Sequence, residues 1–408
     1  MKINNERLWQ RLMQMAQIGA IPSDGVNRQA LSREEQESWR LMQQWAQASK
    51  LEICSDASGN LFVVLPGVDS QAPALLLGSH LDSQPTGGRF DGVYGVLAAM
   101  EVLTVLRENS VQPHCDVVAV SWMNEEGSRF APGMMGSSFF SGARSLAEIY
   151  AVTDISGVSV SEALQAMQQS IPLPTWRGTF PPAGYLEVHI EQASLLEKSA
   201  TTIGVVQGIQ GKITWEITLR GERGHAGTVP MSERRDVLHS FTRVAQQLYQ
   251  QMGDIDPQVM FTIGRIEMQP NAPSVIPDAL MFRIDLRHPQ AALLAALATR
   301  IEKHILQSAV PCEVEILRLS EAAPNDFDVR LQQMISASAA SRGYSAMPLL
   351  SAAGHDARYL AQVCPSAMIF IPSRAGISHA PEEWSEPEHV YSGAQVLLDV
   401  VLRWLERT

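Results

Sequence analysis

Hydrophobic residues follow two different repeats along the chain, and the change between them divides it into regions. Residues 74–82 and 115–126 are near-continuous apolar runs that end in polar residues. Between them, residues 92–109 carry apolar side chains at helical spacing. Apolar strands that alternate with helices are typical of a sheet that is covered by helices on both faces. The pattern therefore predicts an α/β fold for this region.

A second pattern begins near residue 205. Residues 213–224, 259–270 and 279–289 alternate between apolar and polar positions, as half-buried antiparallel strands do. Residues 236–252 and 290–307 have the periodicity of amphipathic helices. Strands and helices of this kind predict a compact α+β unit.

The buried α/β pattern returns from about residue 325. We therefore predict two domains. An α/β domain is formed by residues 1–205 and 323–408, and an α+β domain at residues 206–322 is inserted into it. Residues 1–50 are expected to be helical, because their apolar positions recur at helical spacing.

Composition and charge narrow the range of partners. The chain has 408 residues, of which 45% are hydrophobic and 18% charged, as in ordinary globular proteins. Its net charge of −12 argues against nucleic acid and anionic membranes as partners, because both require a basic surface. We expect neither a membrane span nor a signal peptide. Four scattered cysteines without a C-x-x-C pair favour a cytoplasmic location: Cys54, Cys115, Cys312 and Cys364.

Histidines and acids gather where the predicted strands end. Open α/β sheets bind ligands at the carboxyl ends of their strands. Imidazole and carboxylate ligands without cysteine suit zinc, manganese, cobalt or nickel. The candidate ligands are His80, Asp82, Asp91, Glu125, Glu126, His189, Glu191, His355, Asp356 and His379.

Each of these signals also has a simpler interpretation. His80 and Asp82, two positions apart, suit a metal-binding imidazole held by a carboxylate, but such a pair is more often found at the surface or capping a helix. The adjacent Glu125 and Glu126 suit a ligand beside a general base, although adjacent acids are usually solvated. His189 could be an ordinary strand histidine, with Glu191 as the ligand instead.

Seven motifs in order carry a resemblance that covers essentially the whole chain. They are "GSHLDSQPTGGRFDG", "NEEGSRFAPGMMGS", "HIEQ", "GHAGTVPM", "PNAPSVIPDALMFRIDLR", "AGHDA" and "GISHAPEE". The chain resembles the di-metal amidohydrolases of the aminoacylase and carboxypeptidase G superfamily. Within it, the chain is most similar to the group of N-carbamoyl-L-amino-acid hydrolase, β-ureidopropionase and allantoate amidohydrolase. The resemblance implies a mixed sheet covered by helices on both faces, with an inserted α+β lid and dimerisation domain.

The resemblance also implies a role for each matching residue. Two divalent ions per subunit would be bound, zinc first, with manganese, cobalt or nickel as alternatives. One ion would be held by His80, Asp91 and His189, and the other by Asp91, Glu126 and His379. Asp82 would orient His80, and Glu125 would be the general base. Further contacts to the reacting group and the substrate would come from His225, Gln192, Asn271, Arg287, Gly354 and His355.

Two of the implied contacts have other interpretations, and one motif departs from the family. Without the resemblance, Arg287 would be interpreted as a surface cation, and a structural role for His355 is nearly as good as a substrate contact. Family members often have "HIEQGP", whereas this chain has "HIEQAS". The change leaves Gln192 in place and puts the local turn in question.

The implied activity is hydrolysis of the ureido C–N bond of an N-carbamoyl-L-amino acid or similar ureido acid, with release of ammonia and carbon dioxide. Allantoate amidohydrolase is the first alternative, and an N-acyl amino acid hydrolase or dipeptidase is the second. A non-catalytic binding protein is a third, but it would not need Glu125. In family members the lid forms a homodimer, and its histidine, here His225, reaches the metal site of the partner subunit.

Overall fold

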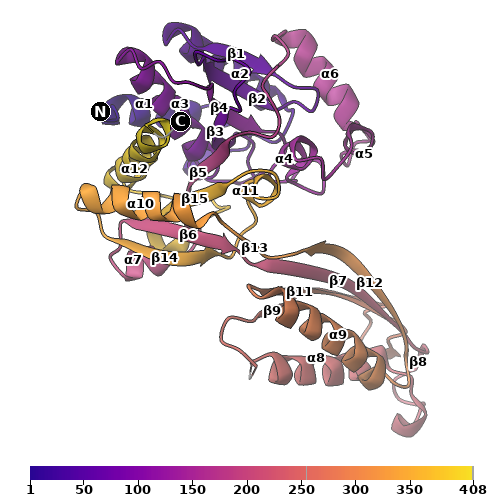
Figure 1. The fold of residues 1–408 in the computed structure, drawn as a ribbon. Helices are drawn as coiled ribbons and strands as arrows, with labels where there is room; N and C mark the ends of the chain where they lie inside the picture. Colours follow the sequence, from indigo (N-terminus) through magenta and orange to yellow (C-terminus); the bar gives the residue numbers. More distant parts are fainter. Residues whose placement is uncertain (254, 407–408) are drawn as a thin grey trace. The chain divides into compact units, whose positions relative to one another are not determined.

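The computed structural model describes residues 1–253 and 255–406. The chain forms two compact units, one from Met1–Gln207 with Asp326–Thr408 and the other from Gly208–Asn325 (Figure 1). The domain boundaries expected from the sequence were at residues 205 and 322, against 207 and 325 for these units. Among the described residues, no helix is long and apolar enough to cross a membrane.

The first unit is built on a nine-stranded mixed sheet. Along one path its order is β1-β2-β4-β3-β5-β15-β6-β13, and β14 also pairs with β6. The strands are β1 (Glu52–Ser55), β2 (Leu61–Leu65), β3 (Leu75–His80), β4 (Val117–Trp122), β5 (Gly184–Ile190), β6 (Ile203–Ile209), β13 (Asn325–Asp326), β14 (Ala346–Ser351) and β15 (Ser366–Ile371).

Four neighbouring strands at the centre of the sheet run parallel. β3 pairs in parallel with β4 and β5, and β5 pairs in parallel with β15. All residues of these four strands are buried, which explains why most of their residues are apolar. Because the strands are parallel, their carboxyl ends lie at one edge of the sheet. The loops that follow them can therefore meet there.

Helices pack on both faces of this sheet. They are α1 (Asn5–Met15), α2 (Arg33–Ala48), α3 (Val93–Glu108), α4 (Met135–Phe140), α5 (Leu146–Tyr150), α6 (Val160–Ser170), α7 (Leu195–Lys198), α10 (Val329–Ser341), α11 (Ala357–Leu360) and α12 (Pro387–Leu405). On one face, a Cβ at Gly95 of α3 would collide with the carbonyl oxygen of Val188, and a Cβ at Gly393 of α12 would collide with Ile371 of β15. On the other face, the backbone N–H of Ala357 in α11 donates to Glu187. The predicted α/β class is confirmed.

The amino-terminal region is less continuous than expected. α1 and α2 confirm the helical pattern, and Asn4 and Ser32 cap them by accepting hydrogen bonds from the backbone. Between them, a short 3₁₀ turn at Pro22–Asp24 contains Ser23 in the left-handed region, with φ of 72°. The prediction of one helical stretch over residues 1–50 is therefore wrong between the two helices.

The described residues of the second unit form a four-stranded antiparallel sheet in the order β12-β7-β11-β9, two helices and a separate two-stranded antiparallel sheet of β8 and β10. Its elements are β7 (Gly211–Arg220), β8 (Gly224–His225), α8 (Val237–Gly253), β9 (Met260–Gln269), β10 (Val275–Ile276), β11 (Ala279–His288), α9 (Ala291–Ser308) and β12 (Glu313–Ala322). Alternate residues of β7 and β11, including Trp215 and Phe282, form a core with α8 and α9. The opposite face carries ion pairs such as Arg283–Glu216. The alternation seen in the sequence thus corresponds to one buried and one polar face.

Candidate metal centre

The candidate ligands of the first unit lie at the carboxyl ends of the four parallel strands. His80 ends β3, and Asp91 lies in the loop between β3 and α3. Glu125 and Glu126 follow β4, His189 is in β5 and His379 follows β15. Because these strands are neighbours in the order β4-β3-β5-β15, residues up to 299 positions apart (80 to 379) are brought together.

Two groups of potential ligands share Asp91. In the first group, Asp91 Oδ1 lies 3.6 Å from His80 Nε2 and 3.2 Å from His189 Nε2. In the second, Asp91 Oδ2 lies 3.2 Å from His379 Nε2, which is 3.4 Å from Glu126 Oε2. Each oxygen of Asp91 thus faces a different group, as a carboxylate that bridges two ions would.

The backbone fixes the orientation of both buried histidines. His80 Nδ1 lies 2.9 Å from the carbonyl oxygen of Asp82, and His189 Nδ1 lies 2.9 Å from that of Ile190. A carbonyl oxygen only accepts, so Nδ1 carries the proton in each ring. In the neutral ring, Nε2 is then the lone-pair atom that faces Asp91, and in His189 it also accepts a hydrogen bond from the backbone N–H of Gly92 at 3.2 Å. This is the tautomer that metal-binding histidines adopt.

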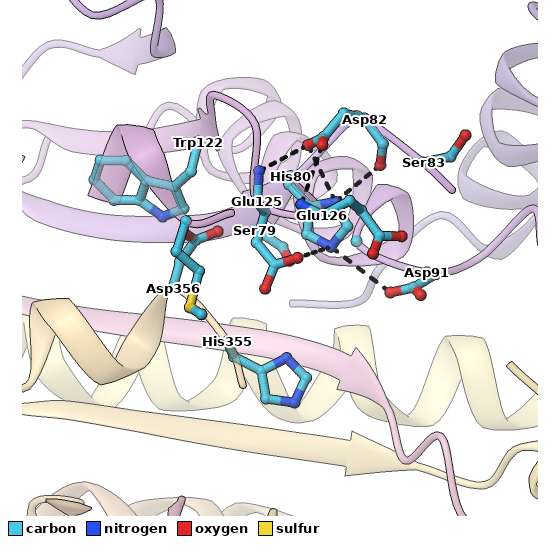
Figure 2. A network of polar contacts seen from close by, with 12 residues as sticks. Ser79, His80, Asp82, Ser83, Asp91, Trp122, Glu125, Glu126, His355 and Asp356 are labelled. Carbon is cyan, nitrogen blue, oxygen red and sulfur yellow. Dashed lines mark hydrogen bonds and ion pairs between the residues drawn. The ribbon is translucent and has the colours of Figure 1, made fainter. Parts of the chain in front are cut away.

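Asp82 has a broader role than the sequence implied. Its carboxylate is 3.5 Å from His80 Nδ1, whereas its carbonyl oxygen makes the shorter contact. The two carboxylate oxygens instead accept hydrogen bonds from the backbone N–H groups of Glu125 and Glu126, each at 3.1 Å (Figure 2). Asp82 therefore orients the pair of glutamates as well as the histidine.

Glu125 faces the centre without belonging to either ligand group. Its Oε2 lies 3.6 Å from His80 Nε2, and its side chain is only 10% exposed. Burial, more than any neighbouring charge, raises the pKa of Glu125 well above its usual range. A carboxylate next to a metal centre, but outside its ligand set, is placed to exchange a proton with a bound reactant.

The pKa values of Glu126, His379 and Asp91 are also shifted, because these charged side chains lie close together and are partly or fully buried. Burial, followed by the charge of Asp91, raises the pKa of Glu126 to about 7. The hydrogen bond to Asp91 is the main cause that raises the pKa of His379 to about 9. Burial opposes ionisation of Asp91, but its three histidine partners hold its pKa well below the usual value.

Divalent cations fit this arrangement. Side chains of Asp82, Asp91 and Glu126 are at most 6% exposed, and buried carboxylates are costly unless cations compensate them. The donor set is nitrogen and oxygen only, which suits zinc and related ions. His80, Asp91 and His189 would hold one ion, and Asp91, Glu126 and His379 the other.

Glu191, Gln192 and His355 lie beside the two ligand groups. Glu191 accepts hydrogen bonds from the backbone of Leu195 and Leu196 and so caps α7, rather than joining either group. Gln192 donates to Asp91 Oδ2 at 2.9 Å, and its Oε1 is buried without a partner. His355 is buried and packs edge-on against His189, with ring centroids 4.6 Å apart.

Gly354 lies against Met134, since a Cβ added to this glycine would come within 3.2 Å of Cε of that methionine. His355 also belongs to a third group of potential ligands, formed with Glu187 and His189. Because His189 is also a member of the first group, the third group is an extension of the same centre. Nε2 of His355 lies 3.1 Å from Ser351 Oγ.

The remaining predicted contacts belong to the second unit. His225 is exposed in β8, and its Nδ1 accepts a hydrogen bond from the backbone N–H of Gly227. Asn271 is exposed and has a left-handed φ of 54°. Arg287 lies on the polar face of β11, where its Nε and Nη2 donate to the carboxylate of Asp285 at 2.8 and 3.2 Å.

Several residues around the centre were not predicted from the sequence. Gln84 donates to Glu126 Oε2 at 2.7 Å, and Ser378 and Glu383 contact the Asp91 loop. Glu187 lies buried behind His189. All four stand inside or beside the seven motifs, but nothing in a linear sequence distinguishes a supporting polar residue from a solvated one.

Comparisons with known proteins agree with this architecture. The family model described as peptidase family M20/M25/M40 matches residues 76–403. The chain is 35% identical over 414 residues to N-carbamoyl-L-amino-acid amidohydrolase of Rhizobium meliloti, with 99% of this chain and 97% of the relative covered. It is 32% identical over 395 residues to allantoate amidohydrolase of Bacillus subtilis (strain 168), with 95% of each covered.

A solved structure is also closely similar. It is an amidase of the hydantoinase/carbamoylase family from Burkholderia multivorans, with a TM-score of 0.90, 38% sequence identity and 98% of each chain covered. The resemblance drawn from the seven motifs is thereby confirmed.

Proposed function

The chain belongs to peptidase family M20/M25/M40, and from this premise we propose that it is a di-metal amidohydrolase of ureido acids. It is a hydrolase that acts on C–N bonds other than peptide bonds. The observation that carries the proposal is the pair of ligand groups that share Asp91, with Glu125 beside them and in neither group. The substrate we propose is an N-carbamoyl-L-amino acid.

The residues of the centre suit hydrolysis of a ureido group. When bound, two divalent ions supply Lewis acidity, which lowers the pKa of water and polarises a carbonyl group. Glu125 takes a proton from water while the oxygen of that water attacks the ureido carbonyl. Glu125 then returns the proton to the departing nitrogen. The buried Oε1 of Gln192 is an acceptor without a partner, and a ureido N–H is a donor that would satisfy it.

The resemblance assigns two residues of the second unit to contacts with the reacting group and the substrate. Gly227 N–H donates to Nδ1 of His225, so the neutral ring carries its proton on Nε2 and can donate it to an oxyanion. Arg287 suits the carboxylate of the substrate, because its guanidinium can donate two parallel hydrogen bonds. Asp285 occupies such a bidentate position beside Arg287.

Ammonia release tests the proposal directly. We expect metal-loaded protein to release ammonia from a panel of N-carbamoyl-L-amino acids, and to lose this activity when a chelator removes the metal. Zinc is the first ion to test, followed by manganese, cobalt and nickel. Full turnover by protein shown by elemental analysis to be free of metal would refute the mechanism.

Allantoate is the second candidate substrate, because the relative from Bacillus subtilis is an allantoate amidohydrolase that matches over 95% of the chain. The same ammonia assay with allantoate and ureidoglycolate separates the two. Release of amino acids from N-acyl amino acids or dipeptides, without ammonia from any ureido acid, would instead indicate an acylase or peptidase.

A further inference from the structure

Glu383 is a buried carboxylate that lies outside both ligand groups and contacts the loops that carry their members. It belongs to the loop between β15 and α12, four residues after His379, and is 1% exposed. One oxygen, Oε1, accepts hydrogen bonds from the backbone N–H groups of Phe90 and Asp91, at 2.9 and 3.0 Å. Glu383 therefore holds the main chain at the residue that both ligand groups share.

The other oxygen of Glu383 holds the loop of His379. Ser378 Oγ donates to Glu383 Oε2 at 2.8 Å and lies 3.3 Å from Asp91 Oδ2. Gln192 Nε2 donates to the same oxygen of Asp91 and to Ser378 Oγ, at 2.9 and 3.1 Å. A continuous set of hydrogen bonds thus joins Glu383, Ser378 and Gln192 to the oxygen of Asp91 that faces His379.

The backbone of the Asp91 loop comes very close to the carboxyl group of Glu383. A Cβ at Gly88 would overlap the carboxyl group of Glu383, so the close approach of the Asp91 loop requires glycine there. His379 has a left-handed φ of 56° and a side chain that is 51% exposed, so it lies outside the regular strands and contacts the acidic side chains of Asp91 and Glu126 from a loop. Strained residues persist where neighbouring contacts determine them.

The two ligand groups differ in how they are supported. In the first, His80 and His189 lie in buried parallel strands, with side chains at most 2% exposed. In the second, His379 depends on a loop whose ends are joined by the hydrogen bond between Arg374 N and Trp384 O. Within that loop, Ser378 and Glu383 contact Asp91 in addition to His379 itself.

We propose that Glu383 is a positioning residue that controls occupancy of the second metal site, formed by Asp91, Glu126 and His379, without binding the ion itself. The proposal rests on the ligand assignment of the proposed function. It predicts that loss of Glu383 weakens the second site far more than the first, because the strands still hold His80 and His189. Groups that orient ligands in this way typically change metal affinity by roughly 10- to 100-fold.

Stepwise metal binding tests the proposal in the full-length protein. Metal-free wild type and variants are titrated with Co²⁺, with visible absorbance as the signal and elemental analysis to count the ions. We expect two ions in wild type. Glu383→Ala should weaken the second step by about 10- to 100-fold. Glu383→Gln should restore part of the affinity, since its amide oxygen still accepts from Phe90 and Asp91.

Two further variants separate positioning from a general loss of structure. Ser378→Ala removes one hydroxyl at a partly exposed position and should also weaken the second step. Combined with Glu383→Gln, it should add less than the sum of the two effects, because both act through the same contacts. Glu382→Gln changes the adjacent exposed acid and should leave both steps unchanged.

The outcomes distinguish this proposal from the assignment on which it rests. If wild type binds two ions and the second step is unaltered in Glu383→Gln and Ser378→Ala, the role of Glu383 is refuted and the metal centre stands. Equal weakening of both steps would refute selective support of the second site. A wild type that binds fewer than two ions would refute both the assignment and the role of Glu383.

Discussion

Asp91 and Asp82 each use both carboxylate oxygens to hold two different parts of the centre. Asp91 uses each oxygen for a different group of histidines, and Asp82 uses each oxygen for the backbone of a different glutamate. Asp82 thus holds the backbone of both glutamates, while their side chains contact different histidines. Glu126 lies with His379, while Glu125 lies closest to His80.

The division of labour between the two glutamates predicts different defects. Glu125→Gln should lower turnover by roughly 10²- to 10⁴-fold, the contribution of a general base, while two ions stay bound. Glu126→Gln should weaken the second metal site instead. Ion counts by elemental analysis, set beside turnover of the reloaded proteins, distinguish the two. If Glu125→Gln loses metal and is active once reloaded, the roles are reversed.

Arg287 predicts selectivity for an anionic substrate. Arg287→Lys replaces a bidentate donor with a point charge, and should weaken kcat/KM for an N-carbamoyl acid by about 10- to 100-fold. A neutral amide analogue of the same substrate should lose far less. Steady-state kinetics on this matched pair measure the difference. Equal losses would remove Arg287 from the substrate site and leave it its ion pair with Asp285, which also pairs with Lys212 of β7.

At the scale of elements, the order of four parallel strands creates the centre, and the sequence reveals only part of that order. The apolar runs of β3 and β4 were recognisable, as were the alternating strands and amphipathic helices of the second unit. Strand order depends on long-range pairing, which local patterns do not encode. The short helices α4, α5 and α6 were also missed, although Ser145 and Ser159 form capping boxes at the start of α5 and α6.

The site residues were predictable to the extent that their motifs identify them. His80, Asp91 and His379 were assigned through motifs that the family shares. Glu383 stood in the last of these motifs without a role, since its burial and its contacts to Phe90 and Asp91 arise only in the fold. Tertiary contacts, rather than residue type, therefore distinguish the residues that support the centre.

We expect a substitution of Gly92, in the loop between β3 and α3, to create a steric clash with a metal ligand. Gly92 has a φ of 65°, and a Cβ there would overlap the imidazole of His80. Gly92→Ala should therefore displace His80 and weaken the first metal site by on the order of tenfold, with a smaller effect on the second. Stepwise metal titration measures both. Gly142→Ala is the matched control, because its φ is 80° and no atom lies within 4 Å of the added Cβ. An unchanged first step in Gly92→Ala would contradict this role of the loop.

At the scale of the whole molecule, the proposed chemistry is divided between two units. Glu125 and the metal ligands belong to the first, while His225 and Arg287 belong to the second. The net charge is −12, yet two divalent ions would contribute four positive charges, which offset those of Asp82, Asp91, Glu125 and Glu126. A cation such as Arg287, which the resemblance assigns to the substrate carboxylate, would then favour an anionic substrate.

The division between units predicts an assembly in which two chains complete each site. We propose a homodimer in which His225 acts at the centre of the partner subunit, as the resemblance implies. A twofold dimer then has two sites, each built from both chains. Glu125→Ala and His225→Ala chains should each be nearly inactive alone. In a mixed dimer, one site carries both defects and the other carries neither.

Coexpression of these two variants with different tags measures the arrangement. Random assortment makes half of the dimers mixed, and half of the sites in each mixed dimer are intact. Recovery should therefore be about a quarter of wild-type activity by this symmetry argument. If His225 acted within its own chain, every site of a mixed dimer would carry one defect and no activity would return. Purified mixed dimers without activity would refute action across the dimer, and a monomer in solution would refute the assembly itself.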